Sequence, residues 1–334
     1  MAAITTPFLA ETPQLRSLNI LRDLPAVANL VEKCFADTMD AEGRRYVQEM
    51  RRAGQDNSFL RWASYAVETA SMPLSGYVWE ENGEIVGNVS LIPFHHRQRK
   101  IYLIANVAVR PDCRLKGIGR ALTVSAMHHA DQRHASETWL HVREDNPGAI
   151  ALYASLGFRE LARRTTWQAK PDRNASADGL GITIARRSSC DWPLQETWLR
   201  RLYPDLLAWY YPMPWVPLRP GIGPAFYRFM MDYNVSQWVA RIDKNPSAVL
   251  SWQAMSGNSD RLWAAVPPEG SERALTALLL NARRDLSWRQ TLTLDFPAGQ
   301  HNASIDAAGF RPYRTLLWMK LQPSDSVDHS VKQT

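Results

Sequence analysis

The residues whose types and spacing best suit them for chemistry lie between Val107 and Arg120. Their order along the chain is Val107-x-Val109-x-Pro111-x-x-Arg114-Leu115-Lys116-Gly117-Ile118-Gly119-Arg120. A strand that ends at a glycine turn and leads into a helix presents unpaired backbone N–H groups together with the positive end of the helix dipole. Such a turn binds anions, phosphates above all, and the cations Arg114, Lys116 and Arg120 add mobile positive charge. The segment therefore predicts a phosphate site, although it is neither a P-loop nor a complete Gly-x-Gly-x-x-Gly fingerprint.

The elements that must hold this turn follow from the periodicity of the apolar residues. Helices are expected over 24–35, within 39–70, over 118–131, and from Ala149 to a terminating Gly157. Strands are expected over 18–22, 76–79, 85–92, 101–109, 138–142 and 158–167. Asn82-Gly83 joins two of these strands as a hairpin, because Asn-Gly supplies the positive φ of a tight turn.

The landmarks after the turn make the pattern specific. They are Leu140-x-Val142, Asn146, Leu152-Tyr153 and Gly157-Phe158. In this order the segment from Asn106 to Arg159 resembles the GNAT superfamily of acetyl-CoA-dependent N-acetyltransferases. With the upstream strands, residues 14–170 fit one GNAT domain. The resemblance implies an α/β (α+β) fold, with a mixed, mostly antiparallel sheet flanked by helices.

The resemblance also implies roles for individual residues. The N–H groups from Arg114 through Leu115, Lys116, Gly117, Ile118 and Gly119 to Arg120 would hold the pyrophosphate of coenzyme A. Val107 and Val109 would bond the pantetheine arm through their main chains, and the N–H of Val107 would polarise the thioester carbonyl. Asn146 matches the family's asparagine near the pantetheine, and Tyr153 matches its tyrosine acid.

The chemistry of Tyr153 can also be argued without the resemblance. A thiol has a pKa near 8.5, so a nearby phenol of pKa about 10 can donate a hydrogen bond or a proton to the departing thiolate. The alternative interpretation is that Tyr153, four residues after Ala149, is only a core aromatic.

The general base stays open at this point. Some relatives carry a glutamate on the strand before the turn, whereas strand 101–109 has no carboxylate and Leu103 stands in that place. Five polar residues near the expected cleft are candidates, each with a structural or solvated role as the alternative: Asn106, His95, His96, His141 and Glu144.

Composition excludes several other classes of protein. A length of 334 residues suggests two domains. The net charge of +6 would be consistent with nucleic-acid binding, but the positive charge is spread evenly along the chain. There are 21 Lys and Arg against 18 Asp and Glu up to Lys170, and 18 against 15 beyond it, so no basic block stands out.

No signal peptide or apolar run of membrane-spanning length is seen, and three scattered cysteines fit a reducing cytoplasm. The histidines lack metal-ligand spacing, so no metal is expected.

The second half contains a degenerate internal repeat. Leu140–Arg159 aligns without a gap onto Leu292–Arg311, and Val109 pairs with Val266. The glycine turn is replaced by Pro267-Pro268-Glu269-Gly270-Ser271-Glu272, in which prolines remove N–H donors and glutamates repel phosphate. Ile305 stands in the place of Tyr153, and Ala298 in that of Asn146.

These observations combine into one prediction. The chain is expected to be a cytoplasmic tandem GNAT protein with an active domain over 14–170, a degenerate copy over 180–321 and a polar tail over 322–334. The first domain would transfer acetyl from acetyl-CoA to a primary amine of a small molecule or peptide by direct attack. A homodimer is left open, and nucleic acid and membrane are not expected partners. The alternative is a non-catalytic acyl-CoA-binding regulator.

Overall fold

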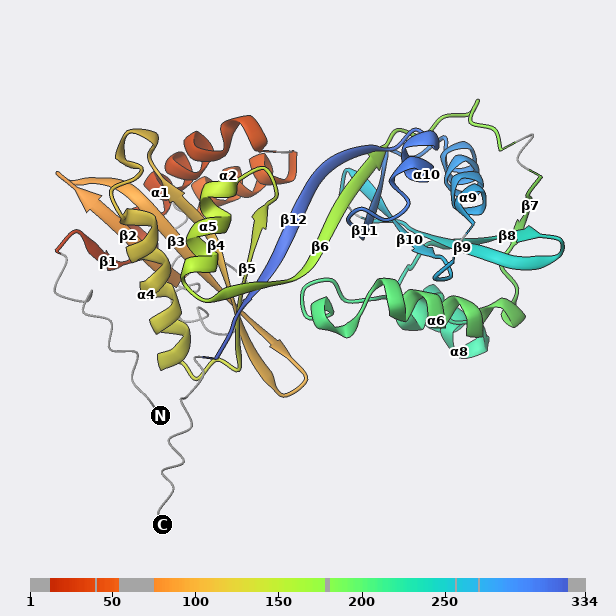
Figure 1. Cartoon of the computed structure of the whole chain (residues 1–334), viewed down its shortest axis with the longest axis horizontal. Coiled ribbons are helices and arrows are strands. Elements are labelled where there is room, and N and C mark those ends of the chain that lie inside the picture. Colours follow the sequence, from red (N-terminus) through yellow and green to blue (C-terminus); the bar gives the residue numbers. More distant parts are fainter. Residues whose placement is uncertain are drawn as a thin grey trace, which may run out of the picture. The chain divides into compact units, whose positions relative to one another are not determined.

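The structure is a computed structural model that describes residues 13–39, 41–53, 75–177, 181–255, 257–269 and 271–323. The chain divides into two compact units. Unit 1 runs to Val142, continues over Asn146–Leu161 and resumes at Trp318, and unit 2 comprises Arg143–Asp145 and Ala162–Leu317. Two long strands, β6 (Phe158–Ala169) and β12 (Arg311–Leu321), therefore contribute residues to both units (Figure 1). The division falls within β6, before the boundary that the sequence predicts between residues 170 and 180.

Unit 1 has its strands in the order β1-β2-β3-β4-β5. Their bounds are β1 (Leu15–Ser17), β2 (Ser75–Glu81), β3 (Glu84–His96), β4 (Arg99–Val109) and β5 (Glu137–Arg143). Its helices are α1 (Ile20–Phe35), α2 (Ala41–Ala53), α4 (Ile118–Gln132) and α5 (Pro147–Ser155). All neighbouring strands from β1 to β4 pair antiparallel, whereas β4 and β5 pair parallel because α4 crosses between them.

The two faces of the unit 1 sheet carry different helices. A Cβ on Gly87 of β3 would meet Leu122 and Ile118 of α4, so this face packs against α4. Val78 and Ala108 belong instead to the core beneath α1. Because successive side chains of a strand point to opposite faces, α1 and α4 cover opposite faces of the sheet.

The start of unit 1 corrects one prediction. Residues 18–22 were expected as a strand, but the strand is β1, and Ile20 already opens α1. The side chain of Asn19 accepts a hydrogen bond from the N–H of Leu21 at 3.0 Å, which caps this helix. The hairpin is confirmed, with Asn82 and Gly83 both at positive φ. Most of the helix expected within 39–70 lies outside the described residues, and α2 covers its first part.

Unit 2 repeats the topology of unit 1. Its strands lie in the order β6-β11-β10-β9-β8-β7, antiparallel except for the parallel pair β10 and β11. The remaining bounds are β7 (Thr183–Arg186), β8 (Val235–Ile242), β9 (Asn245–Gln253), β10 (Ser259–Ala265), β11 (Thr291–Pro297), α6 (Trp192–Leu202), α7 (Trp215–Leu218), α8 (Ile222–Met230), α9 (Glu272–Asp285) and α10 (Asn302–Ala307).

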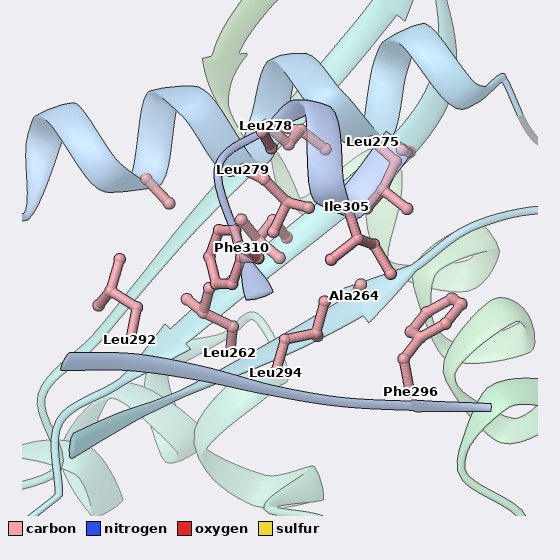
Figure 2. Packing of buried hydrophobic residues seen from close by; sticks show 14 of the residues in the cluster. Leu262, Ala264, Leu275, Leu278, Leu279, Leu292, Leu294, Phe296, Ile305 and Phe310 are labelled. Carbon is pink, nitrogen blue, oxygen red and sulfur yellow. The ribbon is translucent and has the colours of Figure 1, made fainter. Parts of the chain in front are cut away.

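The core of unit 2 follows the alternation of β10. Leu262 and Ala264 pack with α9 and α10, whereas Trp263 and Ala265 pack beneath α6. Figure 2 shows Ile305 of α10 among the leucines of α9 and β11, and Ile305 is fully buried. The residue that aligns with Tyr153 is thus a core aliphatic. The tail expected over 322–334 lies mostly outside the described residues.

Candidate active site

The carboxyl half of β4 has an open edge. Parallel pairing with β5 covers only Ile101 to Ile104, so the two strands separate beyond that point. Ala105, Asn106, Val107 and Val109 are correspondingly only half-buried, whereas the paired residues before them are buried. A strand edge that its neighbour leaves can accept an extended ligand through main-chain hydrogen bonds. The edge lies where the sequence predicts the pantetheine arm.

A β-bulge lies at the start of this edge. Asn88 of β3 pairs with Ala108 and Ser90 with Ala105, so one residue of β3 faces two of β4. Asn106 adopts φ 51°, in the left-handed region that asparagine tolerates better than most residues. Val107, the expected carbonyl-polarising residue, follows directly.

The turn after β4 is an exposed run of backbone donors. Within the described chain, the N–H groups from Leu115 to Arg120 donate to no protein acceptor, and the first bond of α4 joins the N–H of Ala121 to the carbonyl of Gly117 at 3.0 Å. No side chain caps this helix. Gly117, at φ 82°, is the residue whose backbone conformation requires glycine. The start of α4 is therefore free to bind an anion.

The side chains of the turn divide into solvent-facing and core-facing groups. Leu115 also has positive φ, 61°, and its side chain is fully exposed. Lys116 is exposed, while Ile118 is buried on the sheet. A Cβ on Gly119 would make ordinary contacts with Leu152 and Val109, at 3.6 and 3.8 Å, so crowding does not require glycine there.

Two of the three cations are held near the turn. The Nε of Arg114 donates to the carbonyl of Val109 at 3.2 Å, which folds its side chain back over the end of β4. Arg120 donates to the hydroxyl of Ser155 at the end of α5, at 2.6 Å. The structure thus brings Arg114, Lys116 and Arg120 to the exposed turn, as the sequence suggested.

The two predicted residues of α5 differ in their surroundings. The side-chain oxygen of Asn146 accepts from the N–H of Ala149 at 3.1 Å and so caps α5, a role that the resemblance did not imply. Tyr153 is 7% exposed and packs edge-on against Phe158, and its hydroxyl has no protein hydrogen-bond partner among the described residues. Burial raises the pKa of Tyr153 to about 12.

The candidate bases are dispersed. His95 and His96 pair with Lys100 and Arg99 at the opposite end of β4 from the turn. The ring of His141 packs against Trp318 with 4.9 Å between centroids. Glu144 forms a salt bridge with Arg163 at 2.6 Å. Asn106 lies on the open edge of β4, and His141 directly follows Leu140, the last residue of β5 that pairs with β4. Leu103, in place of the family's glutamate, is buried.

The corresponding region of unit 2 is filled by its own side chains. In the alignment, Ala264 and Val266 correspond to Val107 and Val109. The N–H of Ala264 donates to the hydroxyl of Tyr203 at 3.2 Å, and Arg201 donates to the carbonyl of Val266 at 2.8 Å. Ser271 caps α9, with its oxygen accepting from the N–H of Ala274 at 3.3 Å. Neither the strand edge nor the helix start is open.

Sequence reasoning missed two features of these sites. The closure of the strand edge in unit 2 by Tyr203 depends on the path of α6, which no local pattern reveals. In unit 1, Asn88 and Ser90 lie buried beside the bulge. Their polar character within an apolar strand was the available signal. Among the described residues, no three His, Cys, Asp or Glu side chains form a metal-binding group, and no helix has the length and apolar character needed to cross a membrane.

Comparisons with known proteins agree with the architecture of unit 1. Residues 32–158 match the family model described as Acetyltransferase (GNAT) family. The ribosomal protein bS18-alanine N-acetyltransferase of Escherichia coli is 38% identical over 80 residues, covering 24% of this chain and 54% of that protein. A mycothiol acetyltransferase of Thermobispora bispora is 30% identical over 156 residues, covering 46% of this chain and 49% of that protein. The chain thus spans about half the length of each of these relatives.

The fold of the whole chain also has a solved counterpart. The GCN5-related N-acetyltransferase from Sphaerobacter thermophilus superposes with a TM-score of 0.54, covering 93% of this chain and 97% of that chain. The identity is 14%, so the similarity concerns the fold.

Proposed function

Residues 32–158 belong to the acetyltransferase (GNAT) family, and we propose that unit 1 transfers the acetyl group of acetyl-CoA to a primary amine. The observation that carries this proposal is the juxtaposition of two unsatisfied backbone surfaces. The N–H run from Leu115 to Arg120 is suited to a pyrophosphate, and the adjoining edge of β4 is suited to an extended arm. Coenzyme A has both parts in this order.

The two surfaces divide the work of binding. Phosphate oxygens would accept from the amides of the turn while Arg114, Lys116 and Arg120 offset their charge. The pantetheine would add to β4 along Val107 and Val109, and the carboxamide of Asn146, at the start of α5, would face it. This arrangement leaves the thioester at the bulge, where the N–H of Val107 would donate a hydrogen bond to the carbonyl oxygen as negative charge develops on it.

The reaction itself is a direct transfer. The neutral amine nitrogen attacks the carbonyl carbon, an N–C bond forms, and the C–S bond breaks to release the thiolate of coenzyme A. The amine loses one proton, to water or to a group near Asn106, and the thiolate gains one. The turnover therefore balances without a redox step or a metal.

The environment of Tyr153 favours hydrogen-bond donation to the sulfur. With its pKa near 12, a complete proton transfer to a thiolate of pKa about 8.5 would be uphill by roughly 5 kcal/mol. A hydrogen bond from the unpartnered hydroxyl still stabilises the charge that develops as the C–S bond breaks. Water would then supply the proton to the released thiolate.

The acceptor is an amine whose identity varies within the family. One relative named above is a ribosomal protein bS18-alanine N-acetyltransferase and another is a mycothiol acetyltransferase, so we include both peptides and small molecules. Unit 2 would not carry the reaction, because Tyr203 and Ser271 occupy the backbone N–H groups that coenzyme A would need.

The rival function is binding without transfer. It is favoured by one observation, the buried Leu103 in place of a carboxylate on β4. A regulator that senses acyl-CoA would need the phosphate turn but no base.

Release of coenzyme A over a panel of amines separates the two functions. The panel would contain peptides with an N-terminal alanine, polyamines and amino sugars, with the Tyr153→Phe variant as the matched control. Transfer predicts release with at least one amine and a slower rate in the variant. Tight acetyl-CoA binding with no release above the amine-free rate would support the regulator.

A further inference from the structure

Asn88 is a buried polar residue in an otherwise apolar row. It pairs with Val78 of β2 on one side and Ala108 of β4 on the other, and all three are at most 1% exposed. Val78 and Ala108 belong to the core beneath α1. A carboxamide in such a place costs free energy unless its polar groups are used.

Only one end of the carboxamide is used within the protein. Its Nδ2 donates to the carbonyl of Asn106 at 3.0 Å and lies 3.3 Å from the hydroxyl of Ser90. Its Oδ1 is buried and has no hydrogen-bond partner among the described residues. A buried acceptor without a hydrogen bond destabilises a fold. The bond from Nδ2 to the carbonyl of Asn106 is therefore the contact that explains why an asparagine occupies this position.

That bond sets the direction of an N–H group. The carbonyl of Asn106 and the N–H of Val107 belong to the same peptide unit, which is planar and trans, so the two point in opposite directions. Holding the carbonyl toward β3 therefore turns the N–H of Val107 away from β3, toward the edge that β5 leaves open. The hydroxyl of Ser90 accepts instead from the side chain of Asn106, with 3.4 Å between Oγ and Nδ2.

Unit 2 supplies an internal comparison. In the alignment of the two units, Ala265 corresponds to Ala108. Ala265 pairs with Val249, and β9 and β10 pair without a register shift, so Val249 takes the place of Asn88. Val249 and Ala265 lie beneath α6 as Val78 and Ala108 lie beneath α1. A valine thus suits this row where no bulge exists, and the carboxamide occurs where the bulge does.

From these observations we infer that Asn88 is a positioning residue of the transfer reaction. It acts through the Asn106–Val107 peptide and orients the N–H of Val107 to the thioester carbonyl. This inference rests on the proposed function of unit 1 and adds to it a residue on β3 that would tune the polarisation of the acetyl group.

The test measures that polarisation directly. Isotope-edited infrared spectra of acetyl-CoA labelled with ¹³C at the thioester carbonyl would be recorded on the full chain. Binding to the wild type should move the carbonyl band to lower wavenumber. Asn88→Val should lose most of that displacement, and its kcat should fall about tenfold or more while the Kd for acetyl-CoA changes less than about threefold. Ser90→Ala, which keeps the bond from Asn88 to Asn106, is the matched control and should retain the displacement.

The outcomes distinguish this inference from the function on which it rests. An undisplaced band in bound wild type, or an equal displacement in wild type and Asn88→Val, would overturn the role of Asn88 while leaving acetyl transfer intact. No acetyl-CoA binding by the wild type would overturn the proposed function itself. If Asn88→Val does not fold, Asn88→Ser replaces it. The serine side chain is polar but too short for its hydroxyl to reach the carbonyl of Asn106.

Discussion

The hydroxyl of Tyr203 lies 3.2 Å from the backbone nitrogen of Ala264 and accepts its hydrogen bond. Ala264 lies beyond the last residue of β10 that pairs with β11, Leu262, so its N–H is at the place where the two strands separate. The guanidinium of Arg164 lies over the ring of Tyr203, with its carbon 5.0 Å from the ring centroid. In unit 2 a tyrosine of the same chain thus satisfies a strand edge that unit 1 leaves open.

This relationship predicts one acetyl-CoA site per chain. Isothermal titration with acetyl-CoA should give a stoichiometry near one. Tyr203→Phe should lower the free energy of unfolding by about 1 kcal/mol, since it leaves the N–H of Ala264 without its acceptor. The stoichiometry should not change, because Ser271 and the two prolines still block the helix start. A stoichiometry of two in the wild type would contradict this assignment.

Gly117→Asp is expected to weaken acetyl-CoA binding strongly. The substitution places a side chain at φ 82° and a negative charge where the phosphates would bind. Gly117→Ala separates the strain from the charge and should weaken binding less. Glu269→Lys, a charge change in the corresponding exposed loop of unit 2, should leave the Kd unchanged. Equal effects of Gly117→Asp and Glu269→Lys would refute a single site in unit 1.

Tyr153→Phe should lower kcat about tenfold or more with little change in the Kd for acetyl-CoA, because the hydroxyl acts as the C–S bond breaks. Steady-state kinetics and titration on the same preparations would check this. An unchanged kcat would make Tyr153 a core aromatic, the alternative that the sequence left open.

The stability of the fold should decrease at alkaline pH. Burial raises the pKa of Tyr153 to about 12 in the folded state, above a value near 10 in the unfolded chain. The neutral phenol therefore stabilises the fold fully below about pH 10, and that contribution is lost as the pH rises toward 12. Denaturant unfolding at pH 9 and pH 11 should show the wild type losing about 1 kcal/mol more than Tyr153→Phe. Parallel losses would indicate that the phenol is hydrated in the folded state.

Acid should lower the free energy of unfolding by protonating Asp23, which is hydrogen-bonded at the start of α1. Burial alone would raise the pKa of Asp23, but hydrogen bonds from Arg16, from the N–H of Asn19 and from Arg22 outweigh it and lower the pKa. A depressed folded pKa stabilises the fold above the unfolded value near 4, and this contribution is lost as the pH falls below it. Asp23→Asn should reduce the dependence of the unfolding free energy on pH below 4. A variant with the same dependence as the wild type would exclude Asp23 as its source.

Short-range signals predicted much of this protein. The hairpin at Asn82-Gly83, the strand before Pro111 and the helix after Gly117 depend on local φ preferences and periodicity, which act within a few residues. The prediction of a strand over 18–22 was wrong because another local signal was stronger. The side chain of Asn19 accepts from the N–H of Leu21 and caps a helix, and this cap outweighed the short apolar run. The glycine turn and the repeat were therefore accessible from the order of residues.

The sequence by itself determined where the glycine turn lies, because glycine and unpaired N–H groups act locally. Only the tertiary structure decided what surrounds that turn. Asn88 reaches Asn106 because cross-strand pairing, with its extra residue in β4, aligns them. Tyr203 reaches Ala264 because the end of α6 passes the separated strands. Register, bulges and helix paths are set by packing between distant segments, and no pattern within one segment contains them.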